Sequence, residues 1–256
     1  MNTNPWIVDY SNDNKAEIDM FCFHYAGGGA SSFRVLRQNL PETIGLKAIQ
    51  IPGRENRVDE SYFTSLHELA EEIVQALRLE MKRAYVFYGH SMGALLAFEV
   101  ARALRRAQYP LPETLFAAAH RSPDLARQGE AVHTMNDEQV MGVVKRLNGT
   151  ANSVLSDNRV MAYFLPTIKA DFQLLETYRY VEEPPLECPI CALGGSLDKG
   201  IPAEDLERWA QHSKSHRFDM SIFPGGHFFH KEHPEQVAAY ITSQLAELSY
   251  LHESVT

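Results

Sequence analysis

The sequence is poor in cysteine and has no long apolar run. Its three cysteines, Cys22, Cys188 and Cys191, are too few to read as a disulfide framework. No apolar stretch is long enough to span a bilayer, and residues 1–17 have neither the basic start nor the apolar core of a signal peptide. We therefore expect a cytoplasmic protein without a membrane segment.

The chain also lacks an excess of positive charge and any sign of subdivision. Its formal net charge of −9 argues against nucleic acid as the main partner. No internal repeat, low-complexity tract or linker-like segment divides its 256 residues, of which 45% are hydrophobic. We predict one domain over residues 1–256, a monomer, with the polar residues 1–16 as a poorly ordered arm.

Short apolar runs alternate with segments of helical periodicity. The runs predict buried strands at 18–24, 46–51, 84–89, 114–119, 188–194 and 218–223. The helical patterns lie between them, at 32–40, 64–81, 92–107, 203–213 and 234–251. This alternation predicts an α/β fold with a mostly parallel central sheet flanked by helices on both faces.

Between about residues 125 and 185 the alternation stops and only helical patterns occur. Asn136 and Ser156 are suitable N-caps for two helices in this region. A helical insertion late in an α/β sheet predicts a lid, with additional packing helices as the alternative interpretation.

The pentapeptide Gly89-His90-Ser91-Met92-Gly93 fits G-x-S-x-G. An apolar strand pattern precedes it and a clear helical pattern follows it, which is the setting of the nucleophile elbow of the α/β-hydrolase fold. Glycines on both sides remove side chains that would clash in so tight a turn. We predict that Ser91 is the nucleophile of a serine hydrolase; a structural turn with an inert serine is the alternative.

A serine hydroxyl needs a base to take its proton. His227 is the best of the 11 histidines, because it follows the last predicted strand in a glycine-containing loop and comes late in the chain. His230 and His233 lie nearby, and His233 is more typical of a surface residue at a helix start.

The acid that orients the base has two candidates, each directly after a predicted strand. Asp198 lies in GGSLDKG, after the strand that precedes the histidine loop, and Asp124 lies in HRSPDLAR, one strand earlier. We favour Asp198, since Asp124 leads into the predicted lid.

Hydrolysis through a tetrahedral oxyanion requires two backbone N–H donors. Met92, next to the nucleophile, is expected to supply one. The loop His24-Tyr25-Ala26-Gly27-Gly28-Gly29 follows an early strand, and Ala26 is our candidate for the other. A glycine-rich loop can also bind phosphate, but this one fits neither the P-loop nor the dinucleotide pattern.

Other motifs favour structural interpretations. Cys188 and Cys191 have C-x-x-C spacing but lie in a predicted strand, which favours buried core cysteines over a redox pair. His212 and His216 have no nearby third ligand, so we expect no metal. Three arginines of one predicted helix form a solvated face or, alternatively, a basic patch for an acidic partner: Arg102, Arg105 and Arg106.

Taken together, these motifs resemble the discrete, type II thioesterases that accompany nonribosomal peptide and polyketide synthases. The matching segments cover most of the chain in the family's order: 24–33, 51–57, 89–104, 165–180, 188–198 and 223–230. The IPGRE and ADFQLLETY segments matter most, because general esterases lack them. The family commonly has Pro-His before Ala-Gly-Gly, where this chain has His24-Tyr25. The family's acid position matches Asp198, whereas synthase-embedded thioesterases often place the acid where Asp124 lies.

The resemblance implies hydrolysis of acyl or aminoacyl groups from the phosphopantetheine arm of acyl or peptidyl carrier domains, which clears stalled synthases. No cofactor of the enzyme's own is implied. Two rival interpretations stay open at this point. One is a fatty-acyl thioesterase or general carboxylesterase with the same residues, and the other is a catalytically inactive hydrolase fold that serves as a binding module.

Overall fold

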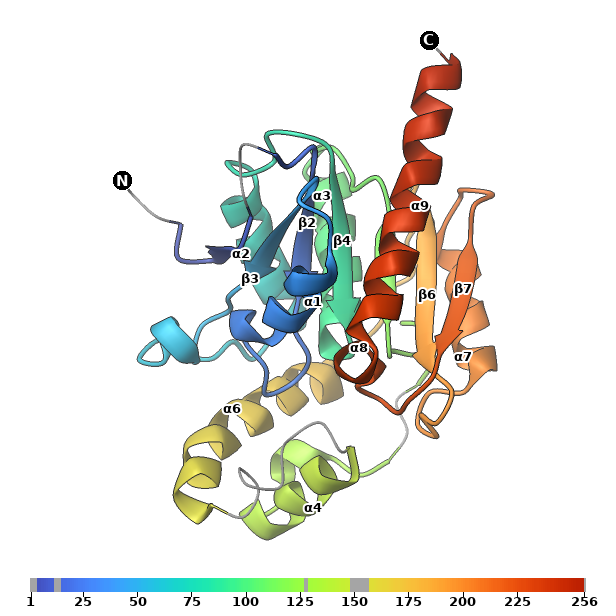
Figure 1. The fold of residues 1–256 in the computed structure, drawn as a ribbon. Coiled ribbons are helices and arrows are strands. Elements are labelled where there is room, and N and C mark those ends of the chain that lie inside the picture. The colour runs from blue at the N-terminus through green and yellow to red at the C-terminus, as the bar shows by residue number, and fades with distance from the viewer. Residues whose placement is uncertain (1–3, 12–14, 127–128, 148–156, 256) are drawn as a thin grey trace.

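One central sheet runs through the computed structural model, which describes residues 4–11, 15–126, 129–147 and 157–255 (Figure 1). In these residues the sheet has seven strands in the order β1-β3-β2-β4-β5-β6-β7, all parallel except β1. The strands are β1 (Ile7–Asp9), β2 (Ile18–Phe23), β3 (Ile44–Ile49), β4 (Tyr85–His90), β5 (Leu115–Ala118), β6 (Ile190–Gly195) and β7 (Asp219–Phe223). The central strands are buried along their length, as their apolar sequences predict for a parallel sheet covered on both faces.

The N-terminal segment contributes an edge strand to this sheet. Ile7 and Val8 pair antiparallel with Ile49 and Ala48 of β3. The prediction of a poorly ordered arm over residues 1–16 was therefore wrong where β1 lies. Trp6 also packs against Phe63 with ring centroids 6.1 Å apart, so an apolar Trp-Ile-Val run holds the segment to the domain.

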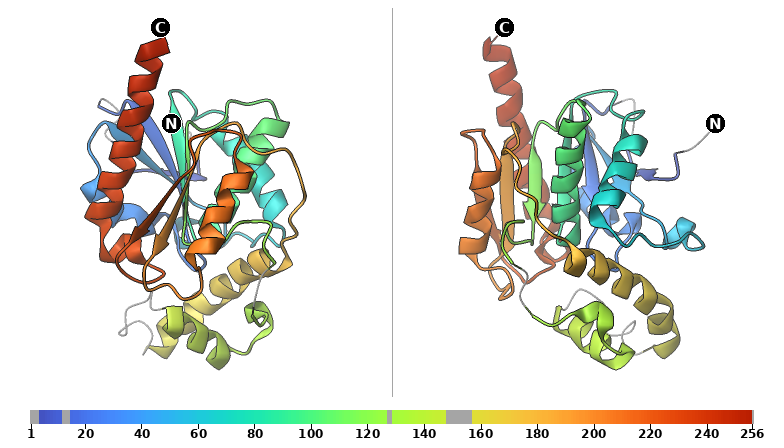
Figure 2. Two further views of the ribbon diagram at one scale, coloured as in Figure 1. Left: turned by 90° about the vertical axis from the view of Figure 1, so that its right-hand side faces the viewer. Right: turned by 180° about the vertical axis from the view of Figure 1, so that it is seen from behind.

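Helices cover both faces of the sheet (Figure 2). One face is covered by α1 (Arg34–Asn39) and α9 (Pro234–Val255), and the other by α2 (Leu66–Leu77), α3 (Met92–Arg106) and α7 (Ala203–Glu207). Two hydrophobic clusters fill the spaces between sheet and helices, one on each side. The four-residue helix α8 (Phe229–Glu232) lies just before α9. The mostly parallel α/β architecture is confirmed.

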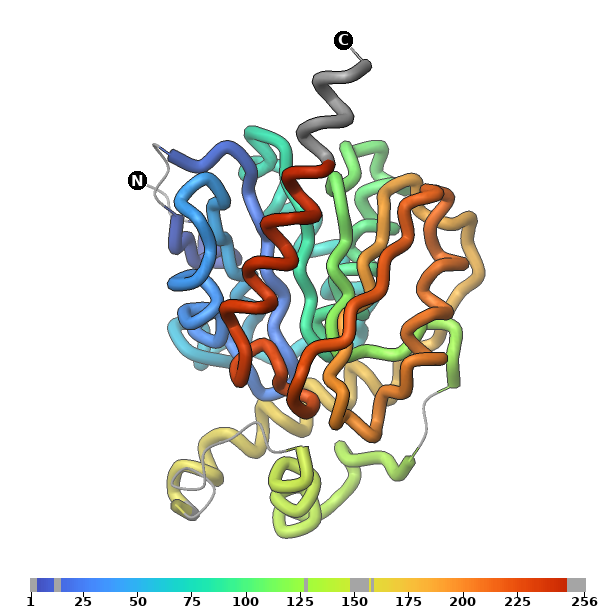
Figure 3. The backbone as a smooth tube through the Cα atoms, turned by 45° about the vertical axis from the view of Figure 1, so that its right-hand side comes forward, coloured from blue at the N-terminus to red at the C-terminus, as the bar shows by residue number. Residues whose placement is uncertain are grey.

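The insertion between β5 and β6 contains α4 (Asp137–Leu147) and α6 (Asn158–Thr177). Both helices lie beyond one end of the sheet (Figures 1 and 3). Asn136 caps α4 as predicted, because its Oδ1 accepts from Gln139 N–H over 2.9 Å. The cap of α6 is Asp157, and the predicted cap Ser156 lies outside the described residues.

Candidate active site

Ser91 occupies a strained turn between β4 and α3. Its φ of 55° and ψ of −118° lie outside the usual regions for a residue with a side chain. A Cβ on Gly89 would lie 2.2 Å from the Gly93 carbonyl oxygen, and a Cβ on Gly93 would lie 1.9 Å from that of Phe23. Both flanking glycines are therefore required by close backbone approaches, and the turn presents Ser91 at the start of α3.

The structure brings Ser91, His227 and Asp198 together from three separate loops. His227 Nε2 lies 2.9 Å from Ser91 Oγ, and His227 Nδ1 lies 2.6 Å from Asp198 Oδ2. The carboxylate can only accept, so Nδ1 carries the proton and Nε2 is free to accept from the serine hydroxyl. Residues 91 and 227, which are 136 positions apart in the sequence, thus meet within hydrogen-bonding distance as predicted.

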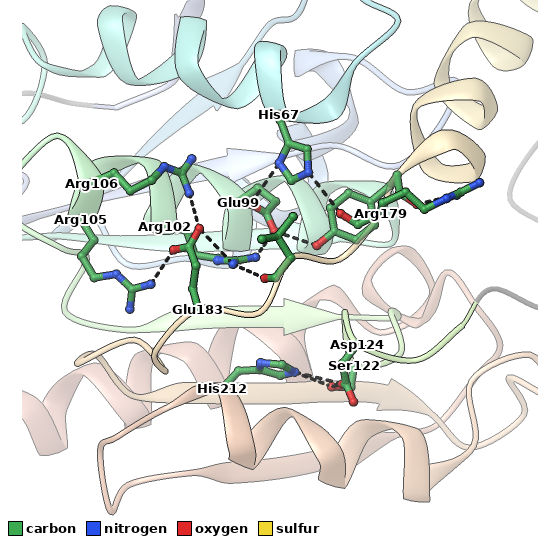
Figure 4. Close-up of polar contacts among 12 residues, drawn as sticks. His67, Glu99, Arg102, Arg105, Arg106, Ser122, Asp124, Arg179, Glu183 and His212 are labelled. Carbon is green, nitrogen blue, oxygen red and sulfur yellow. Dashed lines mark hydrogen bonds and ion pairs between the residues drawn. The ribbon is translucent and has the colours of Figure 1, made fainter.

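Asp124 lies in a different group of side chains. Its Oδ1 is 3.1 Å from His212 Nε2 (Figure 4), and its Oδ2 accepts from Arg208 over 2.5 Å. Ser122 Oγ lies 2.9 Å from the same His212 nitrogen. A serine and an acid that share one ring nitrogen cannot relay a proton through the imidazole. Hydrogen bonds from Ser122 and Arg208 hold the pKa of Asp124 well below its usual range, against the effect of burial.

The two expected oxyanion donors are Met92, which directly follows Ser91, and Ala26, which lines the same cavity as Ser91. Met92 is the first residue of α3, so its N–H has no acceptor within the helix. Ala26 lies in the loop after β2, and its N–H makes no hydrogen bond to any residue that the structure describes. Their role as donors stays a prediction.

A cavity of about 770 Å³ opens beside these residues. Ser91, His227, Asp198 and Ala26 are among the residues that line it. The insertion supplies apolar side chains to its wall, among them Val144, Leu147, Met161, Ile168 and Phe172. The site therefore combines a hydrogen-bonded serine, histidine and aspartate with a cavity whose partly apolar wall suits an apolar group.

The structure also shows where the C-x-x-C cysteines and the two histidines His212 and His216 lie. Cys188 and Cys191 are buried free thiols, and burial raises the pKa of each to about 12, so the interpretation as core cysteines is confirmed. His212 binds Ser122 and Asp124, whereas His216 is exposed. Within the described ranges, no cluster of histidine, cysteine and acidic side chains could hold a metal ion.

The prediction of a solvated arginine face was wrong for Arg102, which is only 2% exposed. It donates to Glu99 over 2.7 Å and lies 3.1 Å from Glu183, a residue of the segment that returns from the insertion across α3 (Figure 4). The other two arginines bind carboxylates of the same chain: Arg105 binds Glu183, and Arg106 binds Glu183 and Glu71.

Arg54 and Asp171 were not among the site residues predicted from the sequence. Their side chains form a buried bidentate ion pair, with nitrogen–oxygen distances of 2.6 and 2.7 Å, next to the loop that carries Ala26. Both residues lie in segments that support the family resemblance, at 51–57 and 165–180. A lone carboxylate among apolar residues in ADFQLL was the available signal for Asp171.

Three histidines from the strand ends and the short helix α8 near Ser91 and His227 are buried: His24, His90 and His230. Burial, followed by the nearby Arg54 charge, lowers the pKa of His24 to about 4. Burial also lowers the pKa values of His90 and His230 well below the usual range. His90 Nε2–H donates to the His227 carbonyl oxygen over 2.8 Å, so a neutral ring helps to hold the histidine loop.

These pKa shifts predict acid lability. The unfolded chain takes up protons near pH 6.5, whereas folded His24 does so only near pH 4, so stability is lost as the pH falls through this window. We expect His24 alone to lower the free energy of unfolding by about 2 kcal/mol between pH 7 and pH 5. Urea unfolding at both values measures this loss. His24→Gln should reduce the pH dependence by that amount, and the exposed control His216→Gln should not; equal slopes for His24→Gln and wild type would contradict the assignment.

The chain is similar to known proteins along most of its length. A family model, the thioesterase domain, matches residues 19–245. The chain belongs to the thioesterase family. The fold of this thioesterase is also that of BorB, a type II thioesterase from the borrelidin biosynthetic cluster. The two share 33% identity with a TM-score of 0.87, over 96% of this chain and 99% of BorB.

Two curated relatives match this thioesterase over nearly their full lengths. GrsT, a gramicidin S biosynthesis protein of Aneurinibacillus migulanus, is 36% identical over 94% of each chain. LgrE of Brevibacillus parabrevis, named linear gramicidin dehydrogenase, is 38% identical over 96% of this chain and 94% of LgrE. The glycine-rich loop of this thioesterase does not fit the dinucleotide pattern G-x-G-x-x-G. The family match and the fold identify it as a thioester hydrolase of the α/β-hydrolase fold.

Proposed function

We propose that this thioesterase removes acyl and aminoacyl groups from the phosphopantetheine arms of carrier domains in peptide or polyketide synthases. The observation that carries the proposal is the hydrogen-bonded series Ser91–His227–Asp198 at the wall of the 770 Å³ cavity. Relatives named for gramicidin S and borrelidin biosynthesis support the synthase setting. An editing role follows, in which wrongly loaded arms are cleared by hydrolysis.

The reaction proceeds in two steps on Ser91. Its Oγ bonds to the thioester carbonyl carbon while His227 Nε2 takes the hydroxyl proton. The tetrahedral oxyanion accepts from the N–H groups of Met92 and Ala26, and its collapse breaks the carbon–sulfur bond. His227 passes the proton to the departing pantetheine thiol. Water, deprotonated by the same histidine, then releases the acid and restores the serine.

Asp198 acts on the imidazole without taking up a proton itself. It holds Nδ1–H in place and stabilises the imidazolium that forms when His227 takes the serine proton. Every catalytic side chain and backbone donor in this scheme belongs to the chain itself, whereas the phosphopantetheine belongs to the substrate and the second nucleophile is water. The helical insertion acts as a lid that shapes the acyl pocket, with the carrier domain outside and its arm reaching to Ser91.

Substrate comparison tests this proposal. The same acyl group is presented as a carrier-bound thioester, as a coenzyme A thioester and as a simple ester, and kcat/KM is measured for each. We expect the carrier-bound thioester to be preferred and Ser91→Ala to abolish its hydrolysis. A preference for the simple ester by several orders of magnitude would defeat the carrier proposal, and a clear preference for coenzyme A thioesters would point to a fatty-acyl thioesterase.

A further inference from the structure

The loop that carries Ala26 is held by side chains from outside the loop. Gly27 N–H donates to Asp171 Oδ2 over 2.7 Å, and the Gly28 carbonyl oxygen accepts from Arg54 Nη1 over 3.1 Å. Gly27 also has a positive φ of 77°, a conformation that the backbone keeps readily only at glycine. Because Ala26 directly precedes these anchored peptides, its direction relative to Ser91 depends on them.

The Arg54–Asp171 pair, which anchors this loop, is itself a rigid unit. Arg54 and Asp171 form two parallel hydrogen bonds of 2.6 and 2.7 Å, and the two side chains are only 6% and 1% exposed. A buried ion pair is maintained only where its geometry is good and its other polar atoms are bonded. Here the remaining contacts go to the backbone: to Gly27 and Gly28 of the loop and to Pro52. The bidentate fork therefore specifies one position for the loop.

The same anchor joins the loop to the insertion. Asp171 belongs to α6, and Arg54 belongs to the segment after β3. A Cβ on Gly27 would lie 2.8 Å from Ile168 Cγ1, so the loop packs directly on α6. Thr167 Oγ1 also donates to the Gly53 carbonyl oxygen over 3.2 Å. Three segments far apart in the sequence thus meet behind the predicted oxyanion donor.

We propose that Arg54 and Asp171 are positioning residues, which hold the 24–29 loop against α6 so that Ala26 N–H faces the oxyanion formed at Ser91. The inference depends on the proposed hydrolysis at Ser91. Neither side chain needs to touch the reacting atoms. The pair acts through the backbone of Gly27 and Gly28. Its loss weakens the hydrogen bond from Ala26 N–H to the oxyanion, which stabilises the transition state more than it contributes to substrate binding.

The test separates positioning from stability. In the double variant Arg54→Met/Asp171→Leu, two apolar side chains replace the pair and no charge is left buried alone, so the urea midpoint should fall only by what the lost bonds to Gly27 and Gly28 cost. We expect kcat on a carrier-bound thioester to fall about 10²–10³-fold, the effect of losing one oxyanion donor, with KM within about threefold. The affinity for an alkyl boronic acid, which forms a tetrahedral adduct with an active-site serine, should fall by a similar factor.

A matched control uses the equally buried pair Lys47–Asp19, whose aspartate lies at the other end of β2. Lys47→Met/Asp19→Leu should leave kcat and boronate affinity unchanged. Asp171→Asn is the milder second variant and carries the test if the first double variant does not fold; we expect its kcat to fall at least tenfold, with KM kept.

The outcomes distinguish this inference from the proposed function. Wild-type kcat and boronate affinity in a folded Arg54→Met/Asp171→Leu variant would overturn the positioning role while hydrolysis stands. Equal losses in the Lys47–Asp19 control would overturn it too. If wild type hydrolyses no thioester, the proposed function fails, and the boronate comparison still measures the role of the pair.

Discussion

Ser91→Ala and His227→Ala are each expected to lower kcat about 10⁶-fold, and the double variant should be no slower than either single one. The reason is that the two groups act as one unit. The serine hydroxyl is a poor nucleophile without the imidazole 2.9 Å away, and the imidazole has no proton to take without the serine. Steady-state hydrolysis of a carrier-bound thioester by the three variants measures this non-additivity.

The chain offers a matched control for these variants. Ser122, His212 and Asp124 also form a serine–histidine–aspartate group, but both oxygens approach the same Nε2 and none of the three lines the cavity. Ser122→Ala and His212→Gln should keep kcat within about twofold of wild type, although each loses a buried hydrogen bond and some stability. Multiplicative losses in the Ser91/His227 double variant would contradict the assignment of these residues to one catalytic unit.

The sequence was sufficient to predict that Ser91 and His227 meet at one end of the sheet, because local signals determine where each residue lies. Gly89, Ser91 and Gly93 span the junction of an apolar strand and a helix, and this order alone places the serine at the carboxyl end of a parallel sheet. His227 follows the last strand, so the fold delivers it to the same end. These predictions needed only periodicity and turn chemistry.

Contacts between segments that are far apart in the sequence could not be predicted from local sequence patterns. Arg54 and Asp171 are 117 positions apart, and neither segment indicates its partner. Arg102 has the spacing of an exposed helix face, but the segment that returns from the insertion covers it with Glu183. The three-residue strand β1 is too short for a clear alternation pattern, and its pairing with β3 is what orders it.

The choice between Asp124 and Asp198 also depends on contacts that local sequence patterns do not indicate. Asp124 follows β5 and Asp198 follows β6, and these strands are neighbours in the sheet, so both carboxylates come to the same edge. Sequence position favours one over the other only weakly. The deciding facts are spatial: one carboxylate lies 2.6 Å from His227 Nδ1, and the other is occupied by Ser122, His212 and Arg208.

Asp198→Asn is therefore expected to lower kcat about 10⁴-fold, while Asp124→Asn should leave it within about twofold of wild type. The carboxamide that replaces the Asp198 carboxylate can donate to Nδ1, which favours the tautomer with the proton on Nε2 and leaves His227 unable to accept from Ser91.

Asp124→Asn should instead lower the free energy of unfolding by about 1–3 kcal/mol, since it weakens the bonds to Arg208, Ser122 and His212. When kcat and urea stability are both measured, Asp198→Asn should lose activity and keep its stability, whereas Asp124→Asn should lose stability and keep its activity. Full activity in Asp198→Asn combined with a large loss in Asp124→Asn would transfer the role of the acid to Asp124. That result would require the loop after β5 to leave its bonds to His212 and Arg208 and reach His227, because the carboxylate must bond Nδ1 directly to hold the imidazole in its reactive tautomer.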